Sequence, residues 1–153
     1  MPIVARDLAA KLRGKAPVTV PLAAAAGSPA LMTAPDALPG YRALIPEGVS
    51  FVNEAAARVI PTLAAYRPGR AAKRIALPIL FCISNTDSVT PPARTPRYAR
   101  TARRGEIKTY DAGHFDLYLG DAFEALVRDQ IEFLTRHLVV ASTPSASDRV
   151  AAR

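Results

Sequence analysis

The stretch Ile79-Leu80-Phe81-Cys82-Ile83, which leads into Ser84-Asn85-Thr86-Asp87, decides the fold of this 153-residue chain. Its five consecutive apolar residues are too few for a helix and do not alternate with polar ones, which is typical of a strand covered on both faces. A helical stretch over 91–104, interrupted at Pro96, separates it from a second predicted strand over 106–110. A strand, a crossover helix and a strand form a βαβ unit with parallel strands. The sequence therefore predicts the α/β class.

Each predicted strand is followed by one ionisable residue that is suited to catalysis. Asp87 follows the first strand, and His114 follows the second in Lys108-Thr109-Tyr110-Asp111-Ala112-Gly113-His114-Phe115. Sites of open α/β sheets form at the carboxyl ends of the strands, so we expect the two side chains to meet there. A carboxylate fixes the tautomer of an imidazole, whose other nitrogen then takes a proton from a hydroxyl. We therefore predict Asp87 and His114 as catalytic residues.

Other interpretations of these residues stay open. The sequence Asn85-Thr86-Asp87-Ser88 also favours a turn, for which an aspartate needs no catalytic role. Asp111 and Asp116 flank His114 as rival acids, although neighbours in one loop rarely reach the imidazole at the required angle. The second histidine, His137, lies at a predicted helix end, where the helix dipole explains it.

The N-terminal half is less regular. We predict a helix over 4–12 that stops at Gly14, then a short extended piece over 17–21 between two prolines. Residues 22–48 form an irregular apolar stretch, because its prolines remove hydrogen-bond donors and restrict the residue before each of them. Asn53 is a candidate cap for a helix that begins at Glu54.

The final helix has a clear pattern. Asp121 and Glu124 form a capping-box pattern at its start, and an apolar stripe follows that must pack on something. Residues 141–153 are small and polar, which predicts a disordered tail. The stripe consists of Phe123, Leu126, Val127, Ile131, Leu134 and Leu138.

Composition describes an ordinary globular chain with 50% hydrophobic and 22% charged residues. Its net charge of +7 comes from scattered residues, and no zinc spacing, recognition-helix pattern or aromatic platform is found, so we do not expect a nucleic-acid partner. The single cysteine, Cys82, lies in an apolar run and is interpreted as a buried structural thiol. No phosphate-binding glycine loop, clustered metal ligands or membrane-length apolar segment is found, so we expect no cofactor, no metal, no membrane partner and a cytoplasmic location. The densest basic group is Arg94, Arg97, Arg100, Arg103 and Arg104.

Taken together, residues 75–138 resemble the C-terminal portion of an α/β-hydrolase. Pro78-Ile79-Leu80-Phe81-Cys82 resembles the penultimate core strand of that family, residues 85–92 its acid loop and residues 113–118 its histidine loop. The chain order of acid before histidine also matches. The resemblance implies a single partial hydrolase domain over 1–140, with a cap-like region at 17–72 and the acid strand, histidine loop and closing helix at 75–138.

What the resemblance implies for function is a serine hydrolase that cleaves a small-molecule ester or amide. Yet the Gly-x-Ser-x-Gly turn that carries the serine occurs nowhere in the 153 residues. Gly48-Val49-Ser50-Phe51-Val52 has the leading glycine without the trailing one. In the family, the serine turn and the oxyanion loop would precede residue 1. We therefore expect the isolated chain to be inactive.

Three roles for the chain stay open. The chain is the acid and histidine part of a longer or split hydrolase, or a non-catalytic subunit that docks on a complementing protein or on a second copy of itself. The third role is that of a polyanion binder, because the chain is basic.

Overall fold

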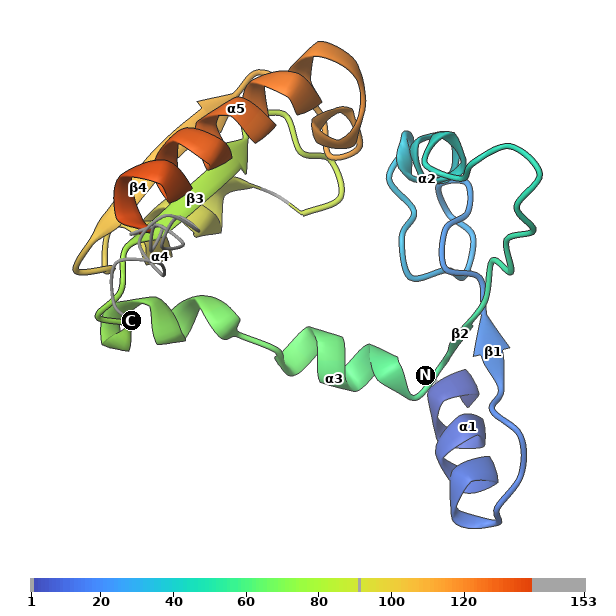
Figure 1. Ribbon diagram of the computed structural model, residues 1–153. Helices are drawn as coiled ribbons and strands as arrows, with labels where there is room; N and C mark the ends of the chain where they lie inside the picture. Colours follow the sequence, from blue (N-terminus) through green and yellow to red (C-terminus); the bar gives the residue numbers. More distant parts are fainter. Residues whose placement is uncertain (1, 91, 139–153) are drawn as a thin grey trace, which may run out of the picture.

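The computed structural model in Figure 1 describes residues 2–90 and 92–138. Short helices and a two-residue strand pair form the N-terminal half, and a parallel strand pair with its helices forms the C-terminal half. The elements in chain order are α1 (Pro2–Leu12), β1 (Thr19–Val20), α2 (Ala37–Ala43), β2 (Ala55–Ala56), α3 (Val59–Ala65), η1 (Pro68–Arg74), β3 (Ile79–Ser84), η2 (Pro92–Arg94), α4 (Thr95–Ala99), β4 (Gly105–Tyr110), η3 (Asp116–Tyr118) and α5 (Gly120–His137).

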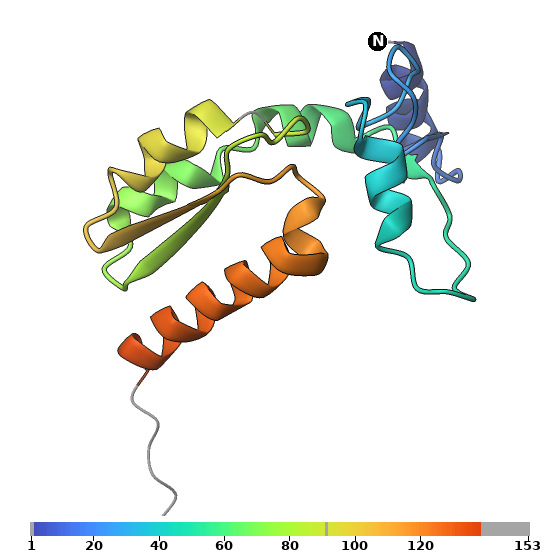
Figure 2. The same ribbon diagram turned by 90° about the horizontal axis from the view of Figure 1, so that it is seen from above.

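Strands β3 and β4 confirm the predicted α/β class. They pair in parallel, with Ile79 opposite Gly105 and Ser84 opposite Tyr110. Figure 2 shows α5 on one face of this pair, and α4 with η1 on the other. The five apolar residues at the start of β3 are therefore flanked by helices on both faces, as the absence of alternation predicted.

The predicted first helix and extended piece are also present, and one buried carboxylate holds them in place. Asp7 of α1 is fully buried and accepts hydrogen bonds from the Val18 N–H at 2.8 Å and the Arg58 N–H at 2.7 Å. The Arg58 guanidinium also donates to both carboxylate oxygens, at 2.7 and 2.9 Å. These contacts hold the pKa of Asp7 far below its usual range, and they join α1 to one end of the β1–β2 pair, where Val18 precedes β1 and Arg58 follows β2.

Helix α2 packs against the histidine loop. This contact joins the N-terminal half of the molecule to the C-terminal half. Ala37 on α2, Ala23 and Phe115 form a buried cluster. Gly40 lies so close to Phe115 that a Cβ there would be 2.4 Å from the ring. Because only glycine has no Cβ, the close approach of α2 to Phe115 depends on Gly40.

Three local predictions were wrong. Asn53 caps no helix, since β2 follows it and its side-chain amide instead forms a pair of hydrogen bonds with the Ala23 backbone. The capping box at Asp121 is absent, because α5 begins at Gly120 and Asp121 therefore lies inside the helix instead of at its cap position. The helical stretch predicted over 91–104 ends at Ala99, and Pro96 lies in the first turn of α4, where the lack of an N–H has no cost.

The apolar stripe of α5 is only partly covered. Phe133, which lies outside the predicted stripe, is the buried residue of α5, whereas Ile131 is 59% exposed. Leu134 and Leu138 are exposed as well. None of the described helices has both the length and the apolar character that crossing a membrane requires. The tail predicted at 141–153 lies outside the described residues.

Candidate active site

Asp87 and His114 meet at the carboxyl ends of β3 and β4, as their positions after the two strands predicted. The His114 Nδ1 atom lies 2.8 Å from the Asp87 Oδ2 atom. The side chain of Asp87 is 11% exposed and that of His114 is 25% exposed. The pair is therefore largely sheltered from bulk water while the imidazole still reaches the surface. The distance is that of a charge-assisted hydrogen bond.

The loop after β3 surrounds the Asp87 carboxylate with further donors. The Val89 and Thr90 N–H groups donate to Oδ1 at 2.9 and 2.6 Å, and the Thr90 hydroxyl donates to Oδ2 at 2.7 Å. Burial raises the pKa of Asp87, but the hydrogen bonds from His114 and Thr90 outweigh it, so that the pKa lies below its usual value. Asp87 is therefore a fixed, ionised acceptor at neutral pH.

Hydrogen bonds between the two loops maintain this arrangement. The buried Ser84 hydroxyl donates to the Ala112 carbonyl, and the Asn85 side chain donates to Asp111 at 2.7 Å. Asp116 accepts from the Gly113 N–H at 2.7 Å. The two rival acids are thus engaged elsewhere, and His114 is paired with Asp87.

The imidazole of His114 is also oriented by aromatic neighbours. The ring of Phe115 lies edge-on at 4.9 Å between centroids, and that of Tyr118 lies at 6.3 Å. Within residues 2–90 and 92–138, no hydrogen bond to the Nε2 atom of His114 is found. Nδ1 faces the carboxylate, so Nε2 is the nitrogen that is available to accept a proton.

The N-terminal half contacts the acid loop through Asp36. Asp36, the residue before α2, accepts a hydrogen bond from the Ser88 hydroxyl of the acid loop. A polar cavity of about 300 Å³ lies beside this contact and is lined by residues 31–34, Ser88 and Val89. Sequence reasoning missed Asp36 and Thr90 as site residues. The available signal was that Thr90 follows Asp87 by three residues, a spacing at which an aspartate side chain accepts hydrogen bonds from its own turn.

Neither of the serines that flank Asp87 has an uncommitted hydroxyl in the described part of the chain. Ser84, at the end of β3, donates to the Ala112 carbonyl, and Ser88, in the acid loop, donates to Asp36. Nor do the described residues contain a group of three or more His, Cys, Asp or Glu side chains that could hold a metal ion. Cys82 is half-buried on β3, with its Sγ atom 3.8 Å from the Tyr110 hydroxyl.

This chain has relatives in sequence among known proteins. Over 136 residues, or 89% of this chain, it is 48% identical to the quorum-quenching protein AidA of Acinetobacter baumannii, of which the match covers 45%. No family model matches the chain.

Two solved structures share its fold. The structure of DcsB in complex with its substrate analogue superposes with a TM-score of 0.69 and 21% identity, covering 88% of this chain and 50% of DcsB. The α/β-hydrolase GrgF from Penicillium sp. sh18 superposes with a TM-score of 0.64 and 21% identity, covering 89% of this chain and 48% of GrgF. The chain thus spans about half the length of each of these three proteins. The described residues have a partly parallel α/β structure similar to that of α/β-hydrolases.

Proposed function

We propose that this chain provides the general base and its orienting acid for a serine hydrolase of the α/β-hydrolase type. The observation that carries the proposal is the 2.8 Å contact between His114 Nδ1 and Asp87 Oδ2 at the ends of two parallel strands. The fold likeness to GrgF supports it. The serine belongs to a polypeptide segment outside these 153 residues, since the chain holds no Gly-x-Ser-x-Gly turn.

In the proposed reaction, His114 takes the serine proton on Nε2 as the serine oxygen attacks the carbonyl carbon of an ester or amide. Asp87 accepts the Nδ1–H and stabilises the imidazolium that forms. The imidazolium then returns the proton to the leaving alcohol or amine, and an acyl-enzyme remains. Water, deprotonated by His114, releases the acid and regenerates the serine. Asp87 carries its negative charge at neutral pH, and the hydrogen bonds that lower its pKa stabilise that charge.

The similarity to the relative from Acinetobacter supports a proposal about the biological role of the completed enzyme. Its 48% identity to a protein named for quorum quenching leads us to propose that the completed enzyme removes a small signal molecule by hydrolysing an ester or amide. The measurement is the signal that remains in a reporter culture after incubation with the completed enzyme, with His114→Ala as the inactive control.

The test of the catalytic assignment uses the purified chain and a p-nitrophenyl ester. We expect no hydrolysis by the chain alone. We expect hydrolysis when a polypeptide with the Gly-x-Ser-x-Gly half of such a fold is added, and a fall in kcat of about 10²–10⁴-fold with His114→Ala. His137→Ala, which changes the other histidine, should leave the rate unchanged. If the chain alone hydrolysed the ester and this activity depended on His114, the claim that the nucleophile lies outside the chain would be refuted. If His114→Ala and His137→Ala lowered kcat equally, the role of His114 would be refuted.

A second candidate function is that of a complementing or interaction subunit without chemistry of its own. Exposed apolar side chains along α5 and at its end favour it, because Ile131, Leu134 and Leu138 are spaced to share one helix face and a contiguous uncovered apolar patch marks an interaction surface. Size-exclusion chromatography distinguishes the two: a clean monomer would count against a docking role, and a stable complex that lacks esterase activity would support it.

A further inference from the structure

Two basic segments on the α4 side of the sheet are exposed and carry no acid. One runs from 67 to 74 through η1, and the other from 94 to 104 through α4. The only acidic residue between Glu54 and Glu106 is Asp87, which is engaged with His114. The nine basic residues, all exposed, are Arg67, Arg70, Lys73, Arg74, Arg94, Arg97, Arg100, Arg103 and Arg104.

None of these nine side chains takes part in an ion pair within the described part of the chain. The cations that do pair are Arg58, Lys108, Arg136 and the two histidines, which belong to other elements. Exposed cations that have no neighbouring anion raise the local positive potential, because nothing close by compensates their charge. The positive charge of this region is therefore available to a partner.

The fold brings the two segments together although β3 separates them in sequence. Gly69 of η1 lies against Tyr98 of α4, so closely that a Cβ on Gly69 would be 2.4 Å from the Tyr98 ring. Figure 2 shows η1, in green, beside α4, in yellow, on the same face of the sheet. The two segments end at Arg74 and Arg104, close to the paired starts of β3 and β4. We call these nine residues the basic face.

The spacing of the cations is regular in both segments. Arg70 and Lys73 are three residues apart along η1, a 3-10 helix in which such side chains lie above one another, about 6 Å apart, and Arg67 is the residue before η1. Along the second segment, Arg94, Arg97, Arg100 and Arg103 have the same spacing. Nine exposed cations spread over two adjacent segments suit an extended polyanion better than a single small anion.

We propose that the basic face binds the phosphodiester backbone of nucleic acid without regard to sequence. Eight of the nine residues are arginines, whose planar guanidinium matches phosphate with two hydrogen bonds. A hollow of about 230 Å³ lined by Arg94, Arg97 and Tyr98 admits a phosphate group. Tyr98, the only aromatic residue of the two segments, is half-buried against Gly69 and offers no stacking platform, so the contacts are electrostatic.

A membrane surface fits the basic face less well. Peripheral membrane-binding surfaces insert large apolar side chains beside their cations. Within 67–74 and 94–104 the residues between the cations are alanine, threonine, proline and glycine, with Tyr98 as the exception. The exposed Tyr66 and Ile75 flank the first segment without lying in it. Nucleic acid is therefore the partner to which the proposal commits.

The experiment measures binding of the purified chain to a fluorescent 20-base-pair DNA duplex by anisotropy over a range of salt concentrations. We expect the logarithm of the affinity to fall linearly with the logarithm of salt concentration, with a slope of about −0.9 for each phosphate contacted. An absence of binding at 50 mM salt would overturn the proposal.

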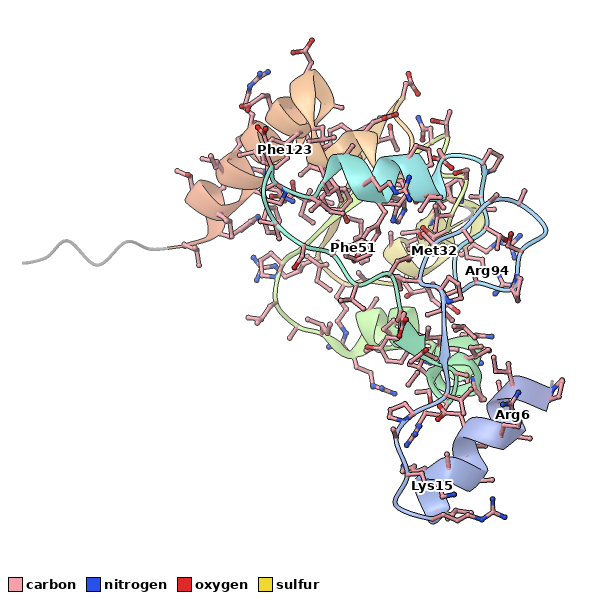
Figure 3. The ribbon with its side chains drawn as sticks, turned by 90° about the vertical axis from the view of Figure 1, so that its right-hand side faces the viewer. Arg6, Lys15, Met32, Phe51, Arg94 and Phe123 are labelled. Atoms are coloured by element: carbon pink, nitrogen blue, oxygen red, sulfur yellow. The ribbon has the colours of Figure 1, made fainter. Side chains whose placement is uncertain are left out.

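Two variants with equal loss of charge make the test specific. The first replaces Arg70, Lys73, Arg97 and Arg100 of the basic face with glutamine. The second replaces Arg6, Lys11, Arg13 and Lys15, which are exposed on and after α1. In Figure 1, α1 and α4 lie at opposite ends of the molecule, and in Figure 3 Arg6 and Lys15 lie well away from Arg94.

We expect the first variant to bind at least tenfold more weakly with a shallower salt slope, and the second to stay within about twofold of the parent at 150 mM salt, where distant charges are screened. Equal losses would show that net charge alone acts and would overturn the proposal. The proposal would also be overturned if polyglutamate, or vesicles with 30% phosphatidylserine, displaced the labelled duplex as effectively as unlabelled DNA does at the same charge concentration. Circular dichroism verifies that both variants keep the helical content of the parent.

Discussion

At the scale of single residues, the Asp87 carboxylate is shared between holding its own loop and orienting His114. Its Oδ1 atom accepts two backbone N–H groups, and its Oδ2 atom accepts both the Thr90 hydroxyl and the imidazole. A carboxylate fixed by three donors from one loop loses little further freedom when it binds the imidazole. Thr90 therefore acts as a positioning residue for the pair.

Replacing Thr90 with valine tests this role. Thr90→Val keeps the shape of the side chain and removes the donor to Oδ2, so we expect the pKa of Asp87 to rise and stability to fall by about 0.5–1.5 kcal/mol at neutral pH. The pKa is measured by NMR titration of the Asp87 carboxyl carbon. Thr90→Ser restores the hydroxyl and should return the pKa toward that of the parent. An unchanged pKa in Thr90→Val would contradict the role.

The meeting of Asp87 and His114 was predictable from sequence, whereas their supporting residues were not. Both positions follow directly from strand ends, and parallel strands bring their carboxyl ends to one edge whatever the loops do. The contact of Asp36 with Ser88 links residues 52 positions apart through an irregular stretch. No periodicity describes such a stretch, so its side-chain contacts depend on tertiary packing that sequence patterns do not encode.

At the scale of elements, the strongest predictions came from burial patterns and the weakest from helix caps. The apolar run of β3 predicts a strand that is flanked on both faces. Coverage of a strand by other elements is a tertiary property, yet it is already visible in the sequence. Asn53 has the residue type of a cap, but its amide matches the Ala23 backbone equally well, and that pairing prevails. Capping residues compete with other local hydrogen bonds, so their presence alone does not fix where a helix begins.

The contact between α2 and the histidine loop allows a prediction with a definite sign. In an open helix, Gly40→Ala would stabilise by about 0.5–1 kcal/mol through helix propensity. Here the new Cβ would lie 2.4 Å from the Phe115 ring, and overpacking of this kind costs about 1–3 kcal/mol. We therefore expect a net loss of stability, measured by urea unfolding.

A double-mutant cycle isolates the steric origin of that loss. Phe115 is 6% exposed, so Phe115→Ala by itself should cost about 3–5 kcal/mol. In that background most of the overlap is gone, and Gly40→Ala should cost less than in the parent. An equal cost in both backgrounds would show that Phe115 is not what makes glycine necessary in α2.

At the scale of the whole molecule, ionised carboxylates join segments that are far apart in the sequence. Each of four carboxyl groups has a pKa below its usual value and lies at a junction between elements. In three of them the main cause is a hydrogen bond from a cation, and in Asp87 the hydrogen bonds described above outweigh burial. The three pairs are Asp7 with Arg58, Glu106 with Arg136, and Asp129 with Lys108.

This arrangement predicts the acid limb of the stability curve. A carboxyl group whose pKa is lower in the folded state stabilises above its unfolded pKa of about 4, and this contribution is lost as the pH falls further, because the unfolded chain then binds more protons. We expect the free energy of unfolding to change little between pH 5 and 7 and to decrease at pH values below about 4, as measured by urea unfolding at each pH.

The Asp7–Arg58 pair should account for part of this acid sensitivity. Asp7 is fully buried with its guanidinium partner, so Asp7→Asn should lower stability at pH 7 and reduce the number of protons taken up on acid unfolding by up to one. Glu47→Gln, at an exposed position without a described ion pair, is the matched control and should leave the limb unchanged. If both variants kept the full slope below pH 4, the Asp7–Arg58 pair would not be a source of the acid sensitivity.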